Sequence, residues 1–432
     1  MIRIKKGDRA TCEEFIAELK SRIKDNDRKV EESVAEIIAE VKKNGDKAVR
    51  EFSVKFDGWA PEKTEMSRED LKAYVDQCDP DFISALERAA ENIREFHARQ
   101  KQQSRIDTYP TGVIMGQRVR GLHRVGVYVP GGTASYPSSV LMNVIPAKIA
   151  ECGEIVMATP PGLGGKLNKD VLAAAYIAGV DRVFLMGGAQ AVAALAFGTE
   201  TVPKVDKIVG PGNIFVAVAK KQLYGTVDID MIAGPSEILV IADSSANPKY
   251  LAADLMSQAE HDRMASAILI TPDEALAKAT AEEIERQMAY LSRKEIIRES
   301  IDTFGAIIVC DNMNVAVDFA NELAPEHLEV CCENPMEYIG RLDNAGSVFL
   351  GHYSPEPLGD YYAGPNHVLP TSGTARFFSP LSVDNFIKKS SFIYYTKDEL
   401  NKASADIIKL AKTEQLTAHA NSIEVRVEDY NK

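Results

Sequence analysis

The adjacent residues Glu326 and His327, which follow Pro325, place a carboxylate next to an imidazole. The residue before a proline is pushed toward extended backbone geometry, so the apolar helical run before Pro325 should end near Ala324. The segment from His327 to Cys332 is typical of the start of a strand. Neighbouring side chains on an extended segment point in opposite directions, so Glu326 and His327 could serve two different proton transfers.

Four further side chains carry donor atoms suited to zinc, although they are far apart in the sequence. Gln258 and His261 lie one turn apart at the end of a predicted helix and share a face. Asp360 stands between glycines in a long irregular stretch, and His419 lies near the end of the chain. Zinc held by nitrogen and oxygen ligands without thiolates is typical of catalytic sites. The spacing does not show that the four converge, and each alone also fits an exposed polar side chain.

Ser236 follows a Gly-Pro turn at a predicted strand end, where its hydroxyl and nearby backbone N–H groups could face a ligand. A plain turn explains the same pattern. The stretch Gly162-Leu-Gly-Gly165 follows a strand but lacks both the spacing of a dinucleotide-binding fingerprint and the acidic residue beyond it. These residues alone therefore do not predict NAD binding.

Composition narrows the class of protein. The chain has 432 residues, of which 45% are hydrophobic and 26% charged, as in an ordinary globular protein. A formal net charge of −13 argues against nucleic acid and anionic membranes as main partners. The sequence has no apolar run of membrane-spanning length, no signal peptide and no CxxC motif among its six cysteines. We therefore expect a cytoplasmic enzyme with reduced thiols.

Strand and helix patterns alternate from about residue 130 onward, which predicts βαβ units and parallel sheets. Several strands end in glycine, and ligands on such sheets bind at the carboxyl ends of the strands. Residues 351–380 are expected to form an irregular functional loop, and residues 422–427 a last strand. His97 lies on a charged helix and is expected to face solvent. The predicted strands are 154–159, 182–186, 207–209, 227–229 and 237–242, and the helices near them are 139–151, 169–178, 189–197 and 213–223.

The chain resembles the histidinol dehydrogenase family over nearly its whole length. The resemblance is carried in order by Val127-Tyr-Val-Pro-Gly-Gly132, Asp230-Met-Ile-Ala-Gly-Pro-Ser-Glu237, Ser257-Gln-Ala-Glu-His261, Ala324-Pro-Glu-His-Leu328, the stretch from Gly359 to Phe377, and Leu416-Thr-Ala-His419. It implies a zinc-dependent, NAD-linked four-electron oxidation of L-histidinol, via L-histidinaldehyde, to L-histidine, the last step of histidine biosynthesis.

We expect an α/β fold with two Rossmann-like parallel-sheet domains and small N-terminal and C-terminal extensions. The expected division is a helical arm over residues 1–25, a discontinuous zinc-binding and catalytic domain over 26–129 and 237–380, an inserted NAD-binding domain over 130–236, and a tail domain over 381–432. The resemblance further implies a homodimer in which this tail reaches the partner's site.

The resemblance also implies roles for individual residues. It assigns Glu326 and His327 as the catalytic acid/base groups. It implies one zinc ion per subunit, held by Gln258, His261, Asp360 and His419, and NAD contacts from Tyr128, Gln190 and Asn213. The implied substrate contacts are Ser236, Gln258, His261, His327, Asp360, His367, Glu414 and His419.

Three other interpretations remain open. A relative of the same fold could oxidise another small alcohol, such as a sulfonated diol, but Glu414 and His367 then lack the amine and ring that they would bind. A zinc hydrolase could use Glu326 as the base on a metal-bound water and would need no NAD. A non-catalytic binding protein gives no reason for zinc ligands, an acid and a base to occur together.

Overall fold

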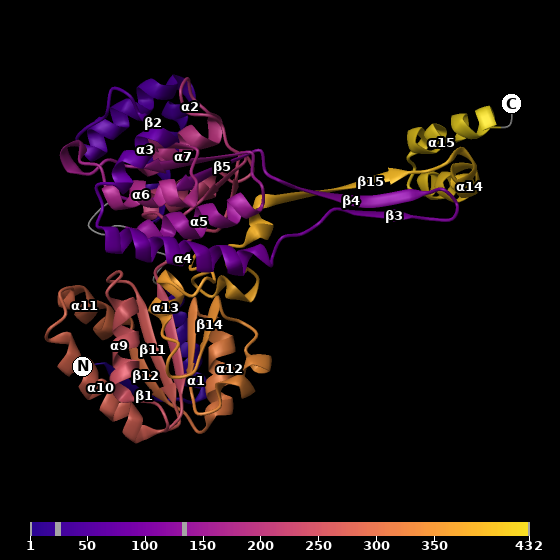
Figure 1. The fold of residues 1–432 in the computed structure, drawn as a ribbon. Helices are drawn as coiled ribbons and strands as arrows, with labels where there is room; N and C mark the ends of the chain where they lie inside the picture. Colours follow the sequence, from indigo (N-terminus) through magenta and orange to yellow (C-terminus); the bar gives the residue numbers. More distant parts are fainter. Residues whose placement is uncertain (1, 22–26, 132–135, 431–432) are drawn as a thin grey trace. The chain divides into compact units, whose positions relative to one another are not determined.

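The computed structural model describes residues 2–21, 27–131 and 136–430. The chain divides into two compact units (Figure 1). The first comprises Met1–Gln100 and Leu122–Phe386, and the second Lys101–Gly121 and Ile387–Lys432. The first unit contains two six-stranded sheets, and the second contains a three-stranded sheet.

The first sheet is parallel except for one edge strand. Its spatial order is β2 (Glu65–Ser67), β7 (Arg182–Leu185), β6 (Glu154–Thr159), β5 (Arg124–Tyr128), β8 (Lys207–Val209) and β9 (Asp228–Ile229), with β2 antiparallel to β7. The chain runs from β5 through β6 to β7 on one side and continues with β8 on the other side of β5. A crevice that can bind a ligand is expected at such a switch point, here between β5 and β8.

Helices cover the first sheet. One core cluster joins it to α2 (Asp27–Asp57), α7 (Gly188–Phe197) and α8 (Ile214–Leu223). The helices α3 (Arg68–Val75), α4 (Pro80–Ala98), α5 (Pro137–Ile149) and α6 (Lys169–Ala178) pack together as a second layer (Figure 1). The helices predicted at 139–151, 169–178, 189–197 and 213–223 are α5 to α8, and their observed ends agree to within two residues.

The second sheet is parallel throughout. Its order is β1 (Arg3–Lys6), β12 (Ala306–Val309), β11 (Ser266–Thr271), β10 (Glu237–Ala242), β13 (His327–Cys331) and β14 (Ser347–Leu350). The cluster on one face contains α9 (Pro248–Ala259), α10 (Glu274–Met288) and α11 (Lys294–Phe304), and the cluster on the other contains α1 (Arg9–Ser21) and α12 (Met313–Leu323). Along β10, Ile238 and Val240 face the first cluster while Leu239 and Ile241 face the second. Burial on both faces explains why this strand reads as an unbroken apolar run.

The second unit combines an antiparallel sheet with a helical hairpin. The sheet order is β15 (Ile387–Tyr394), β4 (Ile114–Gly121) and β3 (Arg105–Thr108), followed by α14 (Lys397–Thr413) and α15 (Thr417–Tyr430). The strand predicted at 422–427 is wrong, because these residues lie within α15. Ile423, Val425 and Val427 alternate as in a strand, but α15 packs along α14, and tertiary packing overrides weak local preference.

Several further outcomes concern the fold as a whole. The α/β class with two parallel sheets is confirmed, whereas residues 351–380 contain the short helix α13 (Glu356–Tyr361) that was not predicted. The domain division stays a proposal, and strand pairing places β2 and β5 in the sheet formed by β6 to β9. Among the residues described, no helix is both long and apolar enough to span a bilayer, and a cytoplasmic location stays a prediction.

Candidate active site

The Glu326–His327 pair lies between α12 and β13, as predicted. Helix α12 ends at Leu323, Ala324 adopts a left-handed conformation with φ of 51°, and His327 is the first residue of β13. Both side chains are buried, with residue exposures of 8% for Glu326 and 3% for His327. Oε2 of Glu326 lies 3.6 Å from Nδ1 of His327, so the two groups interact electrostatically without a hydrogen bond.

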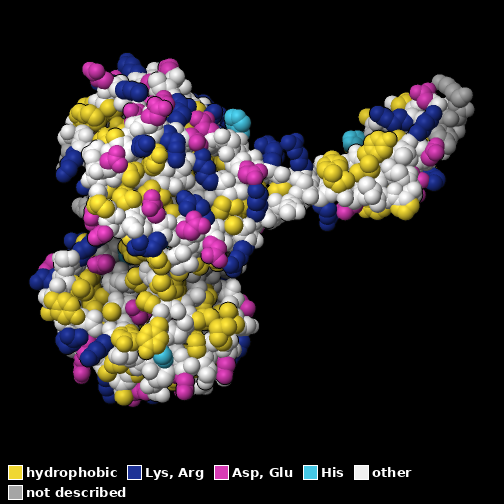
Figure 2. Space-filling view, in the orientation of Figure 1, with side chains coloured by type: hydrophobic (Ala, Val, Ile, Leu, Met, Phe, Trp, Pro, Cys, Tyr) yellow, Lys and Arg dark blue, Asp and Glu magenta, His cyan; other side chains and the backbone are white. Residues whose placement is uncertain are grey.

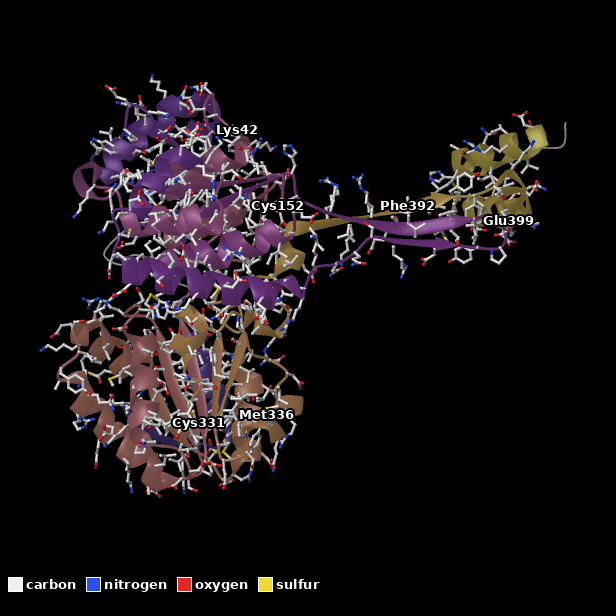
Figure 3. The ribbon with its side chains drawn as sticks, in the orientation of Figure 1. Lys42, Cys152, Cys331, Met336, Phe392 and Glu399 are labelled. Atoms are coloured by element: carbon white, nitrogen blue, oxygen red, sulfur yellow. The ribbon has the colours of Figure 1, made fainter. Side chains whose placement is uncertain are left out.

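The backbone of Glu237 holds both catalytic candidates. Its N–H donates to Oε2 of Glu326 at 2.9 Å, and its carbonyl lies 3.0 Å from Nδ1 of His327. Glu237 begins β10 and His327 begins the adjacent strand β13. This pair therefore lies at the amino end of the second sheet, as the predicted strand start at His327 implies, whereas ligands on parallel sheets usually bind at the carboxyl ends. Cys331, at the other end of β13, is labelled in Figure 3.

Burial and mutual charge shift the pKa values of the pair. Burial raises the pKa of Glu326 to about 7, although the neighbouring His327 acts in the opposite direction. Burial works to lower the pKa of His327, but Glu326, Asp360 and Glu356 outweigh it and raise that pKa to about 10. A carboxyl group with a pKa near neutrality can both accept and release a proton at physiological pH.

Helix α13 brings two more carboxyl groups to the far side of the imidazole. Nε2 of His327 lies 3.9 Å from Oε1 of Glu356 and 3.8 Å from Oδ1 of Asp360. The Asp360 carbonyl accepts a hydrogen bond from Nδ1 of His367 at 3.0 Å. Burial and the charge of Asp360 raise the pKa of Glu356 to about 9, whereas the nearby imidazoles of His327 and His367 lower the pKa of Asp360 despite its burial.

A cavity of about 230 Å³ opens beside these groups. Its lining includes His327, Asp360, His367, Phe349 and Asn366. Nε2 of His327 is buried and has no hydrogen-bond partner among the described residues. The cavity thus offers an imidazole nitrogen and a carboxylate to a small polar ligand.

The expected zinc ligands of the first unit fit a metal in their chemistry. Gln258, buried near the end of α9, places Nε2 2.9 Å from Nδ1 of His327, and its Oε1 accepts no hydrogen bond from any described residue. A buried acceptor without a donor suits a cation. His261 follows α9 and reaches the surface, and its pKa is lowered by desolvation and partly restored by the charge of Asp360. These residues therefore offer oxygen and imidazole donors that zinc accepts.

A second set of possible metal ligands shares only Asp360 with the expected set of Gln258, His261, Asp360 and His419. Ligand atoms of His327, Glu356 and Asp360 lie within 4.8 Å of one another. We favour the set with Gln258 and His261, because metal coordination by His327 would remove the base that the chemistry needs. Glu414 and His419 belong to the second unit, where both are exposed at the end of α14 and the start of α15.

The three expected NAD contacts lie at the carboxyl end of the first sheet. Tyr128 ends β5, and its hydroxyl accepts a hydrogen bond from the N–H of Gly188 at 3.0 Å, while burial raises its pKa to about 12. Gln190 is buried in the first turn of α7, and its Oε1 has no hydrogen-bond partner in the described chain. Asn213 caps α8 by accepting from the N–H groups of Phe215 and Val216. The contacts of these three residues with NAD stay a prediction.

Gly132, the last residue of the Val127–Gly132 motif, lies outside the described residues.

The remaining predicted residue, Ser236, is half-buried next to Glu237 at the start of β10.

The sequence analysis missed Glu356, which lies four residues before Asp360. A helix predicted there would have placed both residues on one face. It also misjudged His97, which is fully buried, with Nδ1 2.7 Å from Oε1 of Gln100 and Nε2 3.4 Å from Nδ2 of Asn366. His97 therefore supports the loop that carries His367.

Behind Glu356 lies a second pair of carboxyl groups, Glu329 and Asp254. Oε1 of Glu329 accepts a hydrogen bond from the N–H of Glu356 at 2.8 Å. Burial raises the pKa of Glu329 well above its ordinary value, and the neighbouring charge of Asp254 adds to this. Burial also raises the pKa of Asp254 to about 6, and a hydrogen bond from Glu329 opposes that shift. Glu329 therefore keeps its proton and donates a hydrogen bond to the carboxylate of Asp254.

This arrangement predicts a pH-dependent stability. The unfolded state releases the Glu329 proton above about pH 4.3, whereas the folded state keeps it, so the stability falls as pH rises from there. Glu329→Gln copies the protonated form. We expect its Tm to match the wild type at pH 4 and to exceed it by a few degrees at pH 8. Thermal unfolding across that range, with exposed Glu295→Gln as the control, measures this; a gain independent of pH would contradict it.

Comparison with known proteins agrees with this geometry. The family model described as histidinol dehydrogenase matches residues 20–427. The histidinol dehydrogenase of Clostridium acetobutylicum is 56% identical over 426 residues, which cover 99% of each chain. That of Listeria monocytogenes is 54% identical over 98% of this chain and 99% of its own.

A solved structure extends the likeness to the fold. The crystal structure of histidinol dehydrogenase from Elizabethkingia anophelis superimposes with a TM-score of 0.93 at 38% identity, covering 100% of this chain and 99% of the other. The sequence comparison and the structural comparison thus both extend over essentially the full length of the chain. The chain belongs to the histidinol dehydrogenase family, whose members are NAD-dependent oxidoreductases.

Proposed function

We propose that this chain oxidises L-histidinol via L-histidinaldehyde to L-histidine in two NAD-linked steps with one zinc ion per site. The observation that carries the proposal is the buried Glu326–His327 pair, whose imidazole borders the cavity beside Asp360. Tyr128, Gln190 and Asn213 would contact NAD. Gln258, His261 and Asp360 would hold zinc together with His419 of a second copy.

His327 is suited to remove the alcohol proton. The carbonyl of Glu237 accepts from Nδ1, which leaves Nε2 as the nitrogen that takes up a proton from the substrate hydroxyl. When bound, zinc would orient the imidazole and amine of the substrate, and its charge would oppose protonation of His327. The proton can then pass to the neighbouring carboxyl groups.

Glu326 is suited to the second oxidation. The aldehyde must first gain water, and a carboxylate with a pKa of about 7 can accept a proton from that water. The N–H of Glu237 fixes one oxygen of Glu326. We expect the other oxygen to accept the proton of the water. The two groups thus divide the proton transfers between them.

The alternative activities are less well supported. A diol substrate would leave the ring- and amine-binding groups His367 and Glu414 without partners. A hydrolase would not need the buried Tyr128 and Gln190 at the switch point of the first sheet. Family membership also opposes a non-catalytic binding protein.

The second unit supports a homodimer. It exposes large hydrophobic side chains along its sheet and helices, namely Ile106, Tyr109, Phe392, Ile393, Tyr394, Leu410 and Val425. Hydrophobic side chains are visible on its surface in Figure 2, and Phe392 is labelled on β15 in Figure 3. Exposed large apolar side chains in such number on one small unit favour a protein interface. We infer that a second copy covers them and that Glu414 and His419 complete the partner's site.

The first prediction of the proposed function concerns stoichiometry and metal. We expect two NADH per L-histidinol consumed, because an alcohol and then an aldehyde are oxidised. A strong chelator should abolish the reaction, and added zinc should restore it. Absorbance of NADH against substrate consumed measures both. Absence of NADH from protein shown to contain zinc would contradict the substrate, and the hydrolase reading would then be tested with ester and amide substrates.

The second prediction separates the two catalytic groups. Glu326→Gln should retain the oxidation of L-histidinol and slow the oxidation of the aldehyde by roughly 100-fold or more, because the base for water is lost. Single-turnover NADH formation from each substrate measures the two steps, with exposed Glu333→Gln as the control. Equal loss of both steps would show that Glu326 has no specific role in the second.

The third prediction tests the shared site. His327→Ala and His419→Ala should each be inactive as pure proteins. Co-refolding them in equal amounts should restore roughly a quarter of wild-type activity, because half of the random dimers are mixed and each has one intact site. No recovery, in dimers shown by mass to be mixed, would place His419 in the site of its own chain.

A further inference from the structure

A buried ion pair in the first sheet domain has no part in the chemistry described so far. Nζ of Lys220, on α8, contacts Oδ1 of Asp230, which directly follows β9. The two side chains are only 4% and 1% exposed. Burying two charges is unfavourable unless further hydrogen bonds satisfy them, so the partners of this pair indicate what it does.

Those partners are backbone groups, and two of them belong to one residue. Nζ of Lys220 donates to the carbonyl of Gly210 at 3.0 Å, and Oδ2 of Asp230 accepts from the N–H of Gly210 at 2.7 Å. Oδ1 of Asp230 also accepts from the N–H of Met231 at 2.6 Å. The ion pair therefore holds both polar backbone groups of Gly210.

Gly210 lies at the proposed cofactor crevice. It follows β8 with φ of +111°, and a Cβ placed there would lie 2.0 Å from the carbonyl oxygen of Tyr128 at the end of β5. Three residues later the loop reaches Asn213, the cap of α8. The loop Gly210–Asn213 thus rests directly on the strand that carries Tyr128, at the switch point of the sheet.

We propose that Lys220 and Asp230 are positioning residues that hold the loop Gly210–Asn213 in the shape that accepts the dinucleotide. The inference rests on the proposed position of NAD at this end of the sheet. The pair acts through Gly210. A loop already fixed before binding loses little conformational entropy when the cofactor arrives, so cofactor affinity depends on the pair.

The same two strands supply a matched control. Lys207, the first residue of β8, is also buried, lies 2.8 Å from Asp228 at the start of β9, and donates to the carbonyl of Asn385 at 2.5 Å. It thus has a carboxylate and a backbone carbonyl as partners, as Lys220 does. It lies at the amino end of the strands, away from the loop.

The test compares Lys220→Met with Lys207→Met by titrating NADH into the zinc-loaded enzyme and following its fluorescence. We expect Lys220→Met to raise the Kd of NADH roughly tenfold or more and to raise KM for NAD more than it lowers kcat. Lys207→Met should also lower Tm, by less than Lys220→Met because the side chain of Asp228 is 51% exposed, and it should leave the Kd near the wild-type value. Equal effects of the two variants on Kd would overturn the inference.

A double variant separates positioning from general stability. Lys220→Met/Asp230→Asn removes the unpaired buried charge that Lys220→Met leaves, so Tm should recover in part. The Kd should remain high, because the hydrogen bond from Lys220 to Gly210 is still missing. Recovery of Tm and Kd together would show that the pair only stabilises the fold.

Hydrogen exchange without cofactor distinguishes failure of this inference from failure of the proposed function. Lys220→Met should speed amide exchange in peptides that cover Gly210–Asn213, and Lys207→Met should not. If Asn213→Ala binds NADH with the same Kd as the wild type, the proposed NAD position is wrong. The proposed effect of Lys220 and Asp230 on cofactor binding is then wrong as well. Unchanged exchange and unchanged Kd in Lys220→Met would overturn the positioning role while NAD binding stands.

Discussion

One backbone residue, Glu237, holds the reactive groups together. Its N–H binds the carboxylate of Glu326 and its carbonyl faces the imidazole of His327. This is possible because Glu237 begins β10 close to the first residue of β13, so that its backbone N–H and carbonyl both reach side chains at the turn into β13. The parallel pairing of these two strands thus fixes the relative position of the acid and the base.

The residues expected to bind NAD and the Glu326–His327 pair lie at opposite ends of their respective sheets. Tyr128, Gln190 and Asn213 lie at the carboxyl end of the first sheet, whereas Glu326 and His327 lie at the amino end of the second. The segment from Asp230 to Ser236 connects them within a few residues. In that segment the N–H of Gly234 donates to Oγ1 of Thr371 at 2.6 Å, which ties it to the loop after His367.

Four acid groups cluster close to the cavity that His327 lines. Oxygens of Glu326, Glu356 and Asp360 lie 3.6, 3.9 and 3.8 Å from the imidazole nitrogens of His327, and the buried Glu329 accepts a hydrogen bond from the N–H of Glu356. Like charges this close cannot all ionise in a buried site, so some carboxyl groups stay protonated. A positively charged substrate and a metal cation would offset this charge, which fits the binding of an amino alcohol with an imidazole ring.

The sequence by itself determined the α/β class, the ends of most central helices and the turn that carries Glu326 and His327, because glycine, proline and apolar periodicity act locally. It did not reveal Glu356, Glu329 or the burial of His97, since a polar residue in a helix or strand gives no sign of what packs against it. It also suggested a strand at 422–427, where packing on α14 makes a helix. Only the tertiary structure decided that the Glu326–His327 pair meets the start of β10 and that Lys220 reaches Gly210, because these contacts join segments that no local pattern relates.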